Sequence, residues 1–290
     1  TQELKNIVHE ENKFSDFDRD PLLFIGLSNE GPAFAVSKNG TGYLGGSSGN
    51  AGQLFRNEKV TATLDDDRAG ENVDAIWFDA NGDGYEDLYV VNGSNEFSQA
   101  STALLDKLYF GTASGKLEAS GQLLPLSNKF HVGSCARNVD IDGDGDQDLF
   151  IGGRLKAGLY GVPADSHILL NDGKGNFSGA KLPKLLKLGM VTDARWAEFD
   201  GDAGKELVVA CEWGPVRILH FDGARIVEVD TLPDGSGLWH SLAVADFNGD
   251  GRDDIFAGNI GGNTQLNVMM DRPVELHVND FDGNGRAEQI

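Results

Sequence analysis

Short loops of carboxylates and glycines recur along this 290-residue chain, and their spacing suits a hard divalent cation. The pattern is D-x-D/N-G-D/N-G-x-x-D/E, and copies start at Asp79, Asp140, Asp246 and Asp280. Positions 1, 3, 5 and 9 carry side-chain oxygens, and position 7 can offer its backbone carbonyl. Calcium (Ca²⁺) takes about six to eight oxygen ligands at roughly 2.3–2.6 Å. Each copy therefore predicts one calcium site.

The predicted ligands follow from the pattern. They are Asp79, Asn81, Asp83, Tyr85 and Asp87; Asp140, Asp142, Asp144, Asp146 and Asp148; Asp246, Asn248, Asp250, Arg252 and Asp254; and Asp280, Asp282, Asn284, Arg286 and Glu288. The fifth member of each set sits at position 9, and the fourth would bind through its carbonyl. Glycine at position 6 permits the sharp backbone reversal around an ion. Four bound ions would change the formal net charge from −22 to −22 + 8 = −14.

Two further copies of the loop have lost part of the pattern. One keeps Asp200, Asp202 and Glu206 but is two residues shorter, so its occupancy is left open. The other, Ser37–Tyr43, keeps the glycine turn without the acids and should hold no ion.

Other interpretations of the acidic loops are weaker. An EF-hand needs a glutamate at position 12 and flanking helices, whereas Val90, Ile151 and Ala257 stand there inside apolar runs. Acidic turns that bind nothing are the remaining alternative, and four near-identical copies argue against it. We expect the calcium to hold the structure together rather than to regulate it.

The segments around the loops read as strands. Each loop follows an alternating apolar run, and most copies enter a second one. Between them, LLNDGKGNFSGA, LYFGTASGKLEAS and ILHFDGARIVEV have the strand–turn–strand pattern of hairpins. Four strands per repeated unit predict an all-β fold, a β-propeller of four-stranded blades. Six units are visible and the last is incomplete. Residues 181–189 would form at most a short helical turn.

Composition limits the domain organisation and the partners. We expect one propeller domain over residues 1–290, and either blades lie outside this chain or the N-terminal segment 1–30 completes the ring. The net charge of −22 excludes nucleic acid and anionic lipid as partners. No apolar run reaches the roughly 18 residues of a membrane span. Cys135 and Cys211 lie in apolar, strand-like runs, as two buried free thiols or as a disulfide. The start at Thr1 without Met suggests a processed or trimmed chain.

The acidic loops and the LLNDGKGNF hairpin resemble the FG-GAP/VCBS repeat family, the calcium-loop propellers known from the integrin α-subunit head. The resemblance covers about residues 30–290. The stretches FSDFDRDPLLF, SNEGPAFAV and GLWHSLAVADFNGDGRDDIFAGNIGGNT are similar to secreted bacterial VCBS-repeat proteins. This likeness implies a seven-bladed propeller, calcium between the first and second strands of a blade, and a secreted, periplasmic or cell-surface protein.

Catalytic motifs are weak in this sequence. Gly40, Gly42 and Gly45 match G-x-G-x-x-G, and Gly45, Ser47 and Gly49 match G-x-S-x-G, but no helix follows either. The six histidines lack zinc spacing. His240 could still line a propeller face, and the four tryptophans are expected in the core.

We therefore expect a binding or scaffold module, outside the cell or on its surface, for a protein or glycan ligand. The alternative is a polysaccharide-active enzyme, a lyase or hydrolase, with its site on the propeller face. A deep pocket that converges on His and Arg or Lys away from the acidic loops would favour the enzyme. A domain that only spaces its neighbours is a third possibility.

Overall fold

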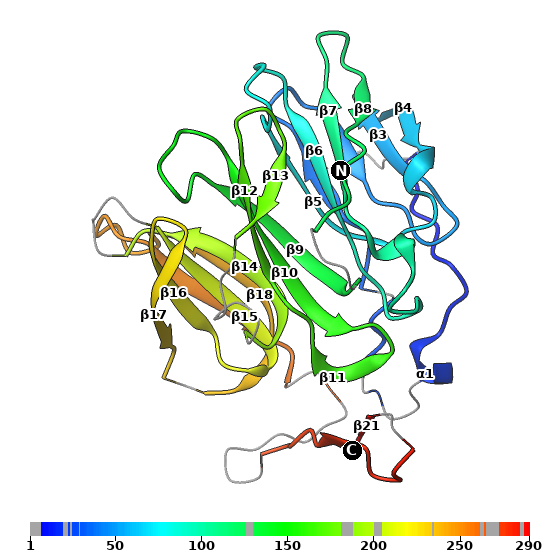
Figure 1. The fold of residues 1–290 in the computed structure, drawn as a ribbon, viewed down its shortest axis with the longest axis vertical. Helices are drawn as coiled ribbons and strands as arrows, with labels where there is room; N and C mark the ends of the chain where they lie inside the picture. The colour runs from blue at the N-terminus through cyan, green and yellow to red at the C-terminus, as the bar shows by residue number, and fades with distance from the viewer. Residues whose placement is uncertain are drawn as a thin grey trace.

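The structure is a computed structural model that describes residues 7–19, 23, 25–28, 30–125, 130–180, 188–199, 205–233, 235–261, 264, 273–284 and 287–290. Strands dominate (Figure 1). Within the described residues the helical pieces are α1 (Asp16–Arg19) and two 3-10 turns, η1 (Asp65–Asp67) and η2 (Thr102–Leu104). None of these helices is long or apolar enough to cross a membrane. The expected helical turn falls largely on residues 181–187, which lie outside the described residues.

The strands form antiparallel sheets in chain order, which we call blades 1 to 5. Blade 1 is β1 (Phe34–Val36), β2 (Gly42–Leu44), β3 (Gly52–Arg56) and β4 (Lys59–Leu64); blade 2 is β5 (Asn72–Phe78), β6 (Asp87–Asn92), β7 (Lys107–Gly111) and β8 (Leu117–Ala119). Blade 3 is β9 (Val132–Val139), β10 (Asp148–Lys156), β12 (His167–Asn171) and β13 (Phe177–Gly179), with an additional strand β11 (Leu159–Pro163) paired to the end of β10. Blade 4 is β14 (Met190–Ala197), β15 (Glu206–Gly214), β16 (Arg217–Asp222) and β17 (Arg225–Thr231). The described part of blade 5 is β18 (Gly237–Ala245) and β19 (Asp254–Asn259), and β20 (Val278–Asn279) pairs with β21 (Glu288–Gln289).

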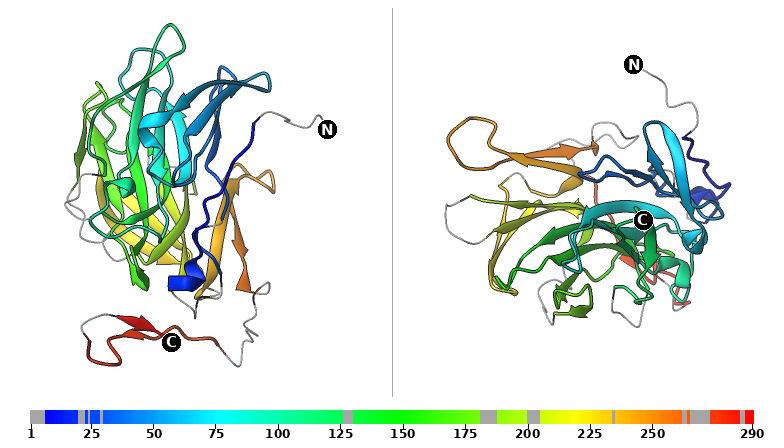
Figure 2. Two further views of the ribbon diagram at one scale, coloured as in Figure 1. Left: turned by 90° about the vertical axis from the view of Figure 1, so that its right-hand side faces the viewer. Right: turned by 90° about the horizontal axis from the view of Figure 1, so that it is seen from above.

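First strands of successive blades pack against one another. β1 contacts β5, β5 contacts β9, β9 contacts β14, and β14 contacts β18. The blades therefore follow one another side by side, as the colour sequence of Figure 2 shows. The predicted all-β propeller of four-stranded blades is confirmed, as are the three hairpins, β7–β8, β12–β13 and β16–β17. A total of seven blades stays a prediction, and the sequence pattern did not reveal β11.

The core lies between blades because successive side chains of a strand point to opposite faces. In the second strand of blade 2, Tyr89 is fully buried against the next blade, where Leu149 lies in the same apolar cluster. Phe150 of blade 3 is fully buried in a cluster with Val191 of blade 4. The same position in β19 is Phe256, which is 69% exposed because no described blade follows.

Buried carboxylates also join neighbouring blades. Arg137 of β9 forms ion pairs with Asp74 of β5 and with Asp193 of β14. Asp193 also accepts a hydrogen bond from the backbone N–H of Leu242 in β18 (2.9 Å). Both cysteines are buried free thiols, which confirms one of the two predicted states.

The N-terminal segment covers the end of the blades at which the first strands begin. Leu23 and Leu27 lie in one apolar cluster with Val132 and Met190, the first residues of β9 and β14. The helix α1 and β11 lie at this same end, along the lower edge of Figure 1. Whether the segment closes the ring stays a prediction.

Candidate metal centres

The acidic loops connect the first and second strands of successive sheets, where the family resemblance placed them. Residues 79–86 join β5 to β6, 140–147 join β9 to β10, 246–253 join β18 to β19, and 280–287 join β20 to β21. The first three therefore follow the ends of first strands that pack side by side. The fourth lies apart, with the β20–β21 pair below the blades in Figure 2 (left).

The second loop shows how this sequence folds locally. The two carboxylate oxygens of Asp140 accept hydrogen bonds from the backbone N–H groups of Gly143 (2.8 Å) and Gly145 (3.1 Å). Asp144 accepts one from the N–H of Asp146 (3.0 Å). Gly143 and Gly145 have φ of +79° and +100°, a conformation that disfavours any side chain. Carboxylates and glycines therefore form the turn together.

The first and third loops repeat this arrangement. Asp79 accepts from Gly82 and Gly84, both at 2.8 Å, and Asp246 accepts from the N–H groups at positions 4 and 6 of its own loop, at 2.6 and 2.9 Å. At position 7, the N–H of Tyr85 donates to Asp83 (2.8 Å), as the N–H of Arg252 does to its own position-5 aspartate (3.0 Å).

The carboxylate at position 9 has a different environment. Asp148 is 1% exposed, and its two oxygens accept from the N–H groups of Ile141 (3.0 Å) and Asn171 (2.8 Å), in the loop and at the end of β12. Asp87 makes the equivalent bonds to the N–H groups of position 2 and of the end of β7. Burial raises the pKa of Asp148 and of Asp87 to about 6, against these hydrogen bonds. Position 9 thus ties the loop to the third strand.

The donor set fits calcium. Asp140, Asp142 and Asp148 each offer one oxygen within 4.8 Å of the others. Oxygens on one ion are at most about 5 Å apart when each metal–oxygen bond is roughly 2.3–2.6 Å. Desolvation and the charges of Asp144 and Asp140 raise the pKa of Asp146, a repulsion that a bound dication would relieve.

The fourth loop holds a similar group. Asp280, Asp282 and Glu288 also bring three oxygens within 4.8 Å of one another. In the first and third loops position 3 is Asn81 or Asn248, and Asn284 occupies position 5 of the fourth. An amide oxygen is still a hard donor, so these loops carry less charge but the same donor type.

The incomplete loops differ as their sequences do. Glu206 is 4% exposed and accepts a hydrogen bond from the N–H of Phe199 (3.2 Å). It therefore makes the same bond to the start of its loop as the position-9 carboxylates of the first two loops do. Asp200, Asp202 and Arg286 lie outside the described residues. In the acid-free loop, Asn39 accepts hydrogen bonds from the backbone N–H and the hydroxyl of Thr41 (3.1 and 2.7 Å). There an amide and hydroxyls replace the carboxylates.

A pocket at the opposite end of the first strands was not predicted. Each of the first strands β5, β9, β14 and β18 has a β-bulge near its start, where one residue has no paired residue in the neighbouring second strand. The skipped residues are Val73, Ser134, Thr192 and His240, and all four line one cavity of about 200 Å³. Because the first strands meet here, we call it the axial pocket.

Charged groups from distant parts of the chain meet beside the axial pocket. Arg154, at 8% side-chain exposure, donates to both oxygens of Glu30 and to Oε1 of Glu212 (3.1 Å). His240 Nε2 lies 3.2 Å from Glu30 Oε1. Burial alone would raise the pKa of Glu30, but Arg154 and then His240 outweigh it and lower that pKa to about 2. Of these four residues only His240 was predicted to line a propeller face, because no local pattern connects the other three.

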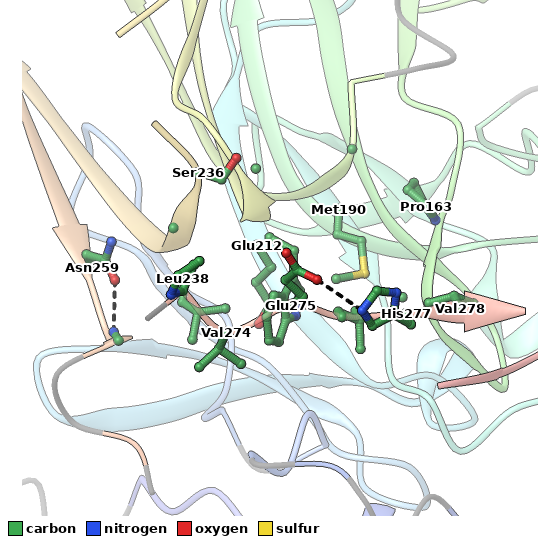
Figure 3. Close-up of a pocket in the computed structure, with 18 of the residues that line it drawn as sticks. Pro163, Met190, Glu212, Ser236, Leu238, Asn259, Val274, Glu275, His277 and Val278 are labelled. Atoms are coloured by element: carbon green, nitrogen blue, oxygen red, sulfur yellow. Dashed lines mark hydrogen bonds and ion pairs between the residues drawn. The ribbon is translucent and has the colours of Figure 1, made fainter. Parts of the chain in front are cut away.

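A larger cavity of about 890 Å³ lies between blade 4, blade 5 and residues 273–278 (Figure 3). Met190, Leu238 and Val274 give it apolar walls. The pair of Glu275 and His277, 3.1 Å apart, lies beside them. Glu212 also lines this cavity, and its ion pair with Arg154 connects it to the wall of the axial pocket.

Comparison with known proteins bears on the repeats. The family model for the FG-GAP-like repeat matches residues 79–151 and 198–257, which include the first-to-second-strand loops of blades 2 to 5, four in all. No curated protein matches the chain.

Two solved structures align with most of the chain. A crystal structure of BBS1N in complex with ARL6DN, soaked with mercury, aligns with a TM-score of 0.47 and 16% identity, over 82% of this chain and 65% of that one. The same complex soaked with lead gives a TM-score of 0.37 and 13% identity, over 79% and 75%. The chain thus spans 65% of the length of the first of these.

The blades and their first-to-second-strand loops define a repeat protein of the β-propeller class. Within that class, residues 79–151 and 198–257 are FG-GAP-like repeats, which confirms the repeat family predicted from the loops. Closeness to the VCBS proteins stays a prediction.

Proposed function

We propose that this propeller is a calcium-stabilised binding module, secreted or exposed on a cell surface, that presents its loops to a protein or glycan ligand. The observation that supports it best is the loop geometry. Two copies gather three carboxylate oxygens within 4.8 Å, and backbone N–H groups orient the position-1 carboxylate in three copies.

Calcium would act in this proposal by linking strands. An ion on Asp140 and Asp142 would also bind Asp148, whose carboxylate already joins the loop to Asn171 of blade 3. An ion that binds only the folded state stabilises it by about 2.7 kcal/mol at a hundred times its dissociation constant. For an exported protein we expect dissociation constants of about 10⁻⁴–10⁻³ M, as in other extracellular calcium modules.

The test is thermal unfolding in calcium and in chelator, for the wild type and two variants. Asp142→Ala removes a position-3 ligand and should reduce the calcium-dependent rise in melting temperature. Asn39→Ala, at position 3 of the acid-free loop, is the matched control. It should lower stability equally in both buffers, because it loses only hydrogen bonds within its own loop, from Ser37 and Thr41. A wild-type transition that calcium does not move would contradict the structural role.

Ligand binding needs its own test. A glycan array and a pull-down from extracellular material, each run with calcium and with chelator, would identify the ligand class. We expect capture in calcium only, because the loops that carry binding residues depend on a rigid scaffold. Equal capture in both buffers would show that ligand binding does not depend on calcium.

The polysaccharide-active enzyme is the second candidate, and the axial pocket favours it, since His240 and Arg154 meet there away from the acidic loops. Two observations weigh against it. Arg154 is already engaged by Glu30 and Glu212. The pocket of about 200 Å³ is also below the roughly 300–1,000 Å³ typical of ligand sites.

A further inference from the structure

We propose that Glu30, Glu212 and His240 form a second kind of metal site, for a divalent first-row transition ion such as Zn²⁺, in the wall of the axial pocket. One ligand atom from each of these side chains lies within 4.8 Å of the other two. They come from the N-terminal segment, β15 and β18, so the tertiary structure builds the site.

Glu212 provides an independent observation. Its side chain is fully buried, and Oε1 accepts from Arg154, but Oε2 has no hydrogen-bond partner among the described residues. A buried carboxylate oxygen without a donor costs about 1–3 kcal/mol or more. A cation would satisfy this oxygen.

Arg154 holds both carboxylates in place. Its guanidinium reaches both oxygens of Glu30 and one oxygen of Glu212. Arginine thereby takes the outer position that orients ligands around many metal sites. A site with its carboxylates already oriented loses less freedom when an ion binds.

The charge favours a cation. Two carboxylates and one guanidinium give −2 + 1 = −1 with His240 neutral. An anionic ligand would face this negative charge. A dication would instead be attracted by this negative charge and bound by three ligand atoms.

The donor types separate this ion from calcium. Imidazole nitrogen with carboxylate oxygens suits zinc and its neighbours, whereas calcium takes oxygen alone. Three protein ligands leave a coordination position open, as in zinc sites that bind water or a small ligand. Ser134 and Thr192 line the axial pocket together with His240, so the pocket offers polar groups to such a ligand.

The acidic loops are too distant to share the ion. His240 precedes Asp246 by six residues of one strand, which corresponds to about 20 Å at roughly 3.3 Å per residue. The proposal therefore stands or falls independently of calcium in the loops.

The test is titration of the full chain with Co²⁺ and Zn²⁺ in excess calcium, which keeps the acidic loops filled. We expect about one equivalent of Co²⁺ with visible absorption bands from nitrogen and oxygen ligation, displaced by Zn²⁺. His240→Gln should weaken binding by more than the roughly 10–100-fold typical of an outer-shell residue. His277→Gln is the matched control, because His277 also faces a glutamate, Glu275, but on the surface.

Glu30→Gln gives a second measurement, since it keeps an acceptor for Arg154 and removes the charge. Circular dichroism and the melting temperature would establish that each variant is folded. Loss of the Co²⁺ bands in His240→Gln and in Glu30→Gln, with wild-type behaviour of His277→Gln, supports the site. Absence of Co²⁺ bands in the wild type, or equal affinity in His240→Gln, overturns it.

Discussion

Replacing Asp148 by alanine in the absence of calcium tests whether position 9 is structural in its own right. The substitution removes the acceptor of two backbone N–H groups, those of Ile141 and Asn171. Hydrogen bonds to a charged group contribute about 1.5–3 kcal/mol each, so the gross loss is about 3–6 kcal/mol. The mutation also relieves the burial that raises the pKa of Asp148 to about 6.

That relief offsets part of the loss. A rise of two pKa units corresponds to about 3 kcal/mol before solvent screening, and about half of that remains after it. The expected net decrease in the free energy of unfolding is therefore about 2–4 kcal/mol for Asp148→Ala. Asp142→Ala, in the same loop, loses one exposed bond of 3.3 Å to the N–H of Asp144. It should cost no more than about 0.5 kcal/mol.

The assay is urea unfolding followed by tryptophan fluorescence, in chelator at pH 7. Asp148→Asn is the graded control, because its amide keeps one acceptor oxygen and should give an intermediate loss. If Asp148→Ala and Asp142→Ala differ by less than about 1 kcal/mol without calcium, the structural role of position 9 is wrong.

Three further outcomes are expected. Arg137→Met removes the cation that joins the partly buried Asp74 to the buried Asp193 and should cost about 3–5 kcal/mol in urea unfolding; a loss below 1 kcal/mol would contradict the ion pairs between blades. Burial raises the pKa of Asp106 to about 8, above an unfolded value of about 3.9, so its contribution to stability is complete at pH 4 and is lost as the pH rises through 8. Asp106→Asn should make the fall in unfolding free energy between pH 4 and pH 8 shallower, by up to about 1.4 kcal/mol per pH unit, and an unchanged slope would refute this. Burial also raises the pKa of Cys135 and of Cys211 to about 12, so a thiol reagent at pH 8 should label neither until the protein unfolds, and rapid labelling of the native protein would contradict their burial.

The acidic loops were predictable because their chemistry is local. Asp140 and Gly145 are five residues apart, and this spacing places the Gly145 N–H within hydrogen-bond distance of the Asp140 carboxylate. Strands followed from alternating apolar residues, and position 11 of the first two repeats, Tyr89 and Phe150, is buried for the same reason. Tyr85 and Arg252 were placed at position 7 by register alone, and their backbones take equivalent bonds in the structure.

The axial pocket could not be predicted in this way. Glu30 and Glu212 are 182 residues apart, and Arg154 joins them only because three blades and the N-terminal segment converge. The β-bulge that turns His240 into the pocket follows from strand pairing, and the local pattern of apolar and polar residues did not reveal it. The strand β11 was not predicted either, because its residues, Leu159–Pro163, lack a clear alternating pattern.

The N-terminal segment has a consequence for the order of events at the ribosome. Leu27 packs beside Met190, and Glu30 reaches His240, more than two hundred positions later in synthesis. Residues 23–30 leave the ribosome before their partners and must therefore wait until these have been made. At about 5–20 residues per second, this delay is on the order of ten seconds or more, during which apolar side chains such as Leu23 and Leu27 stay accessible to chaperones.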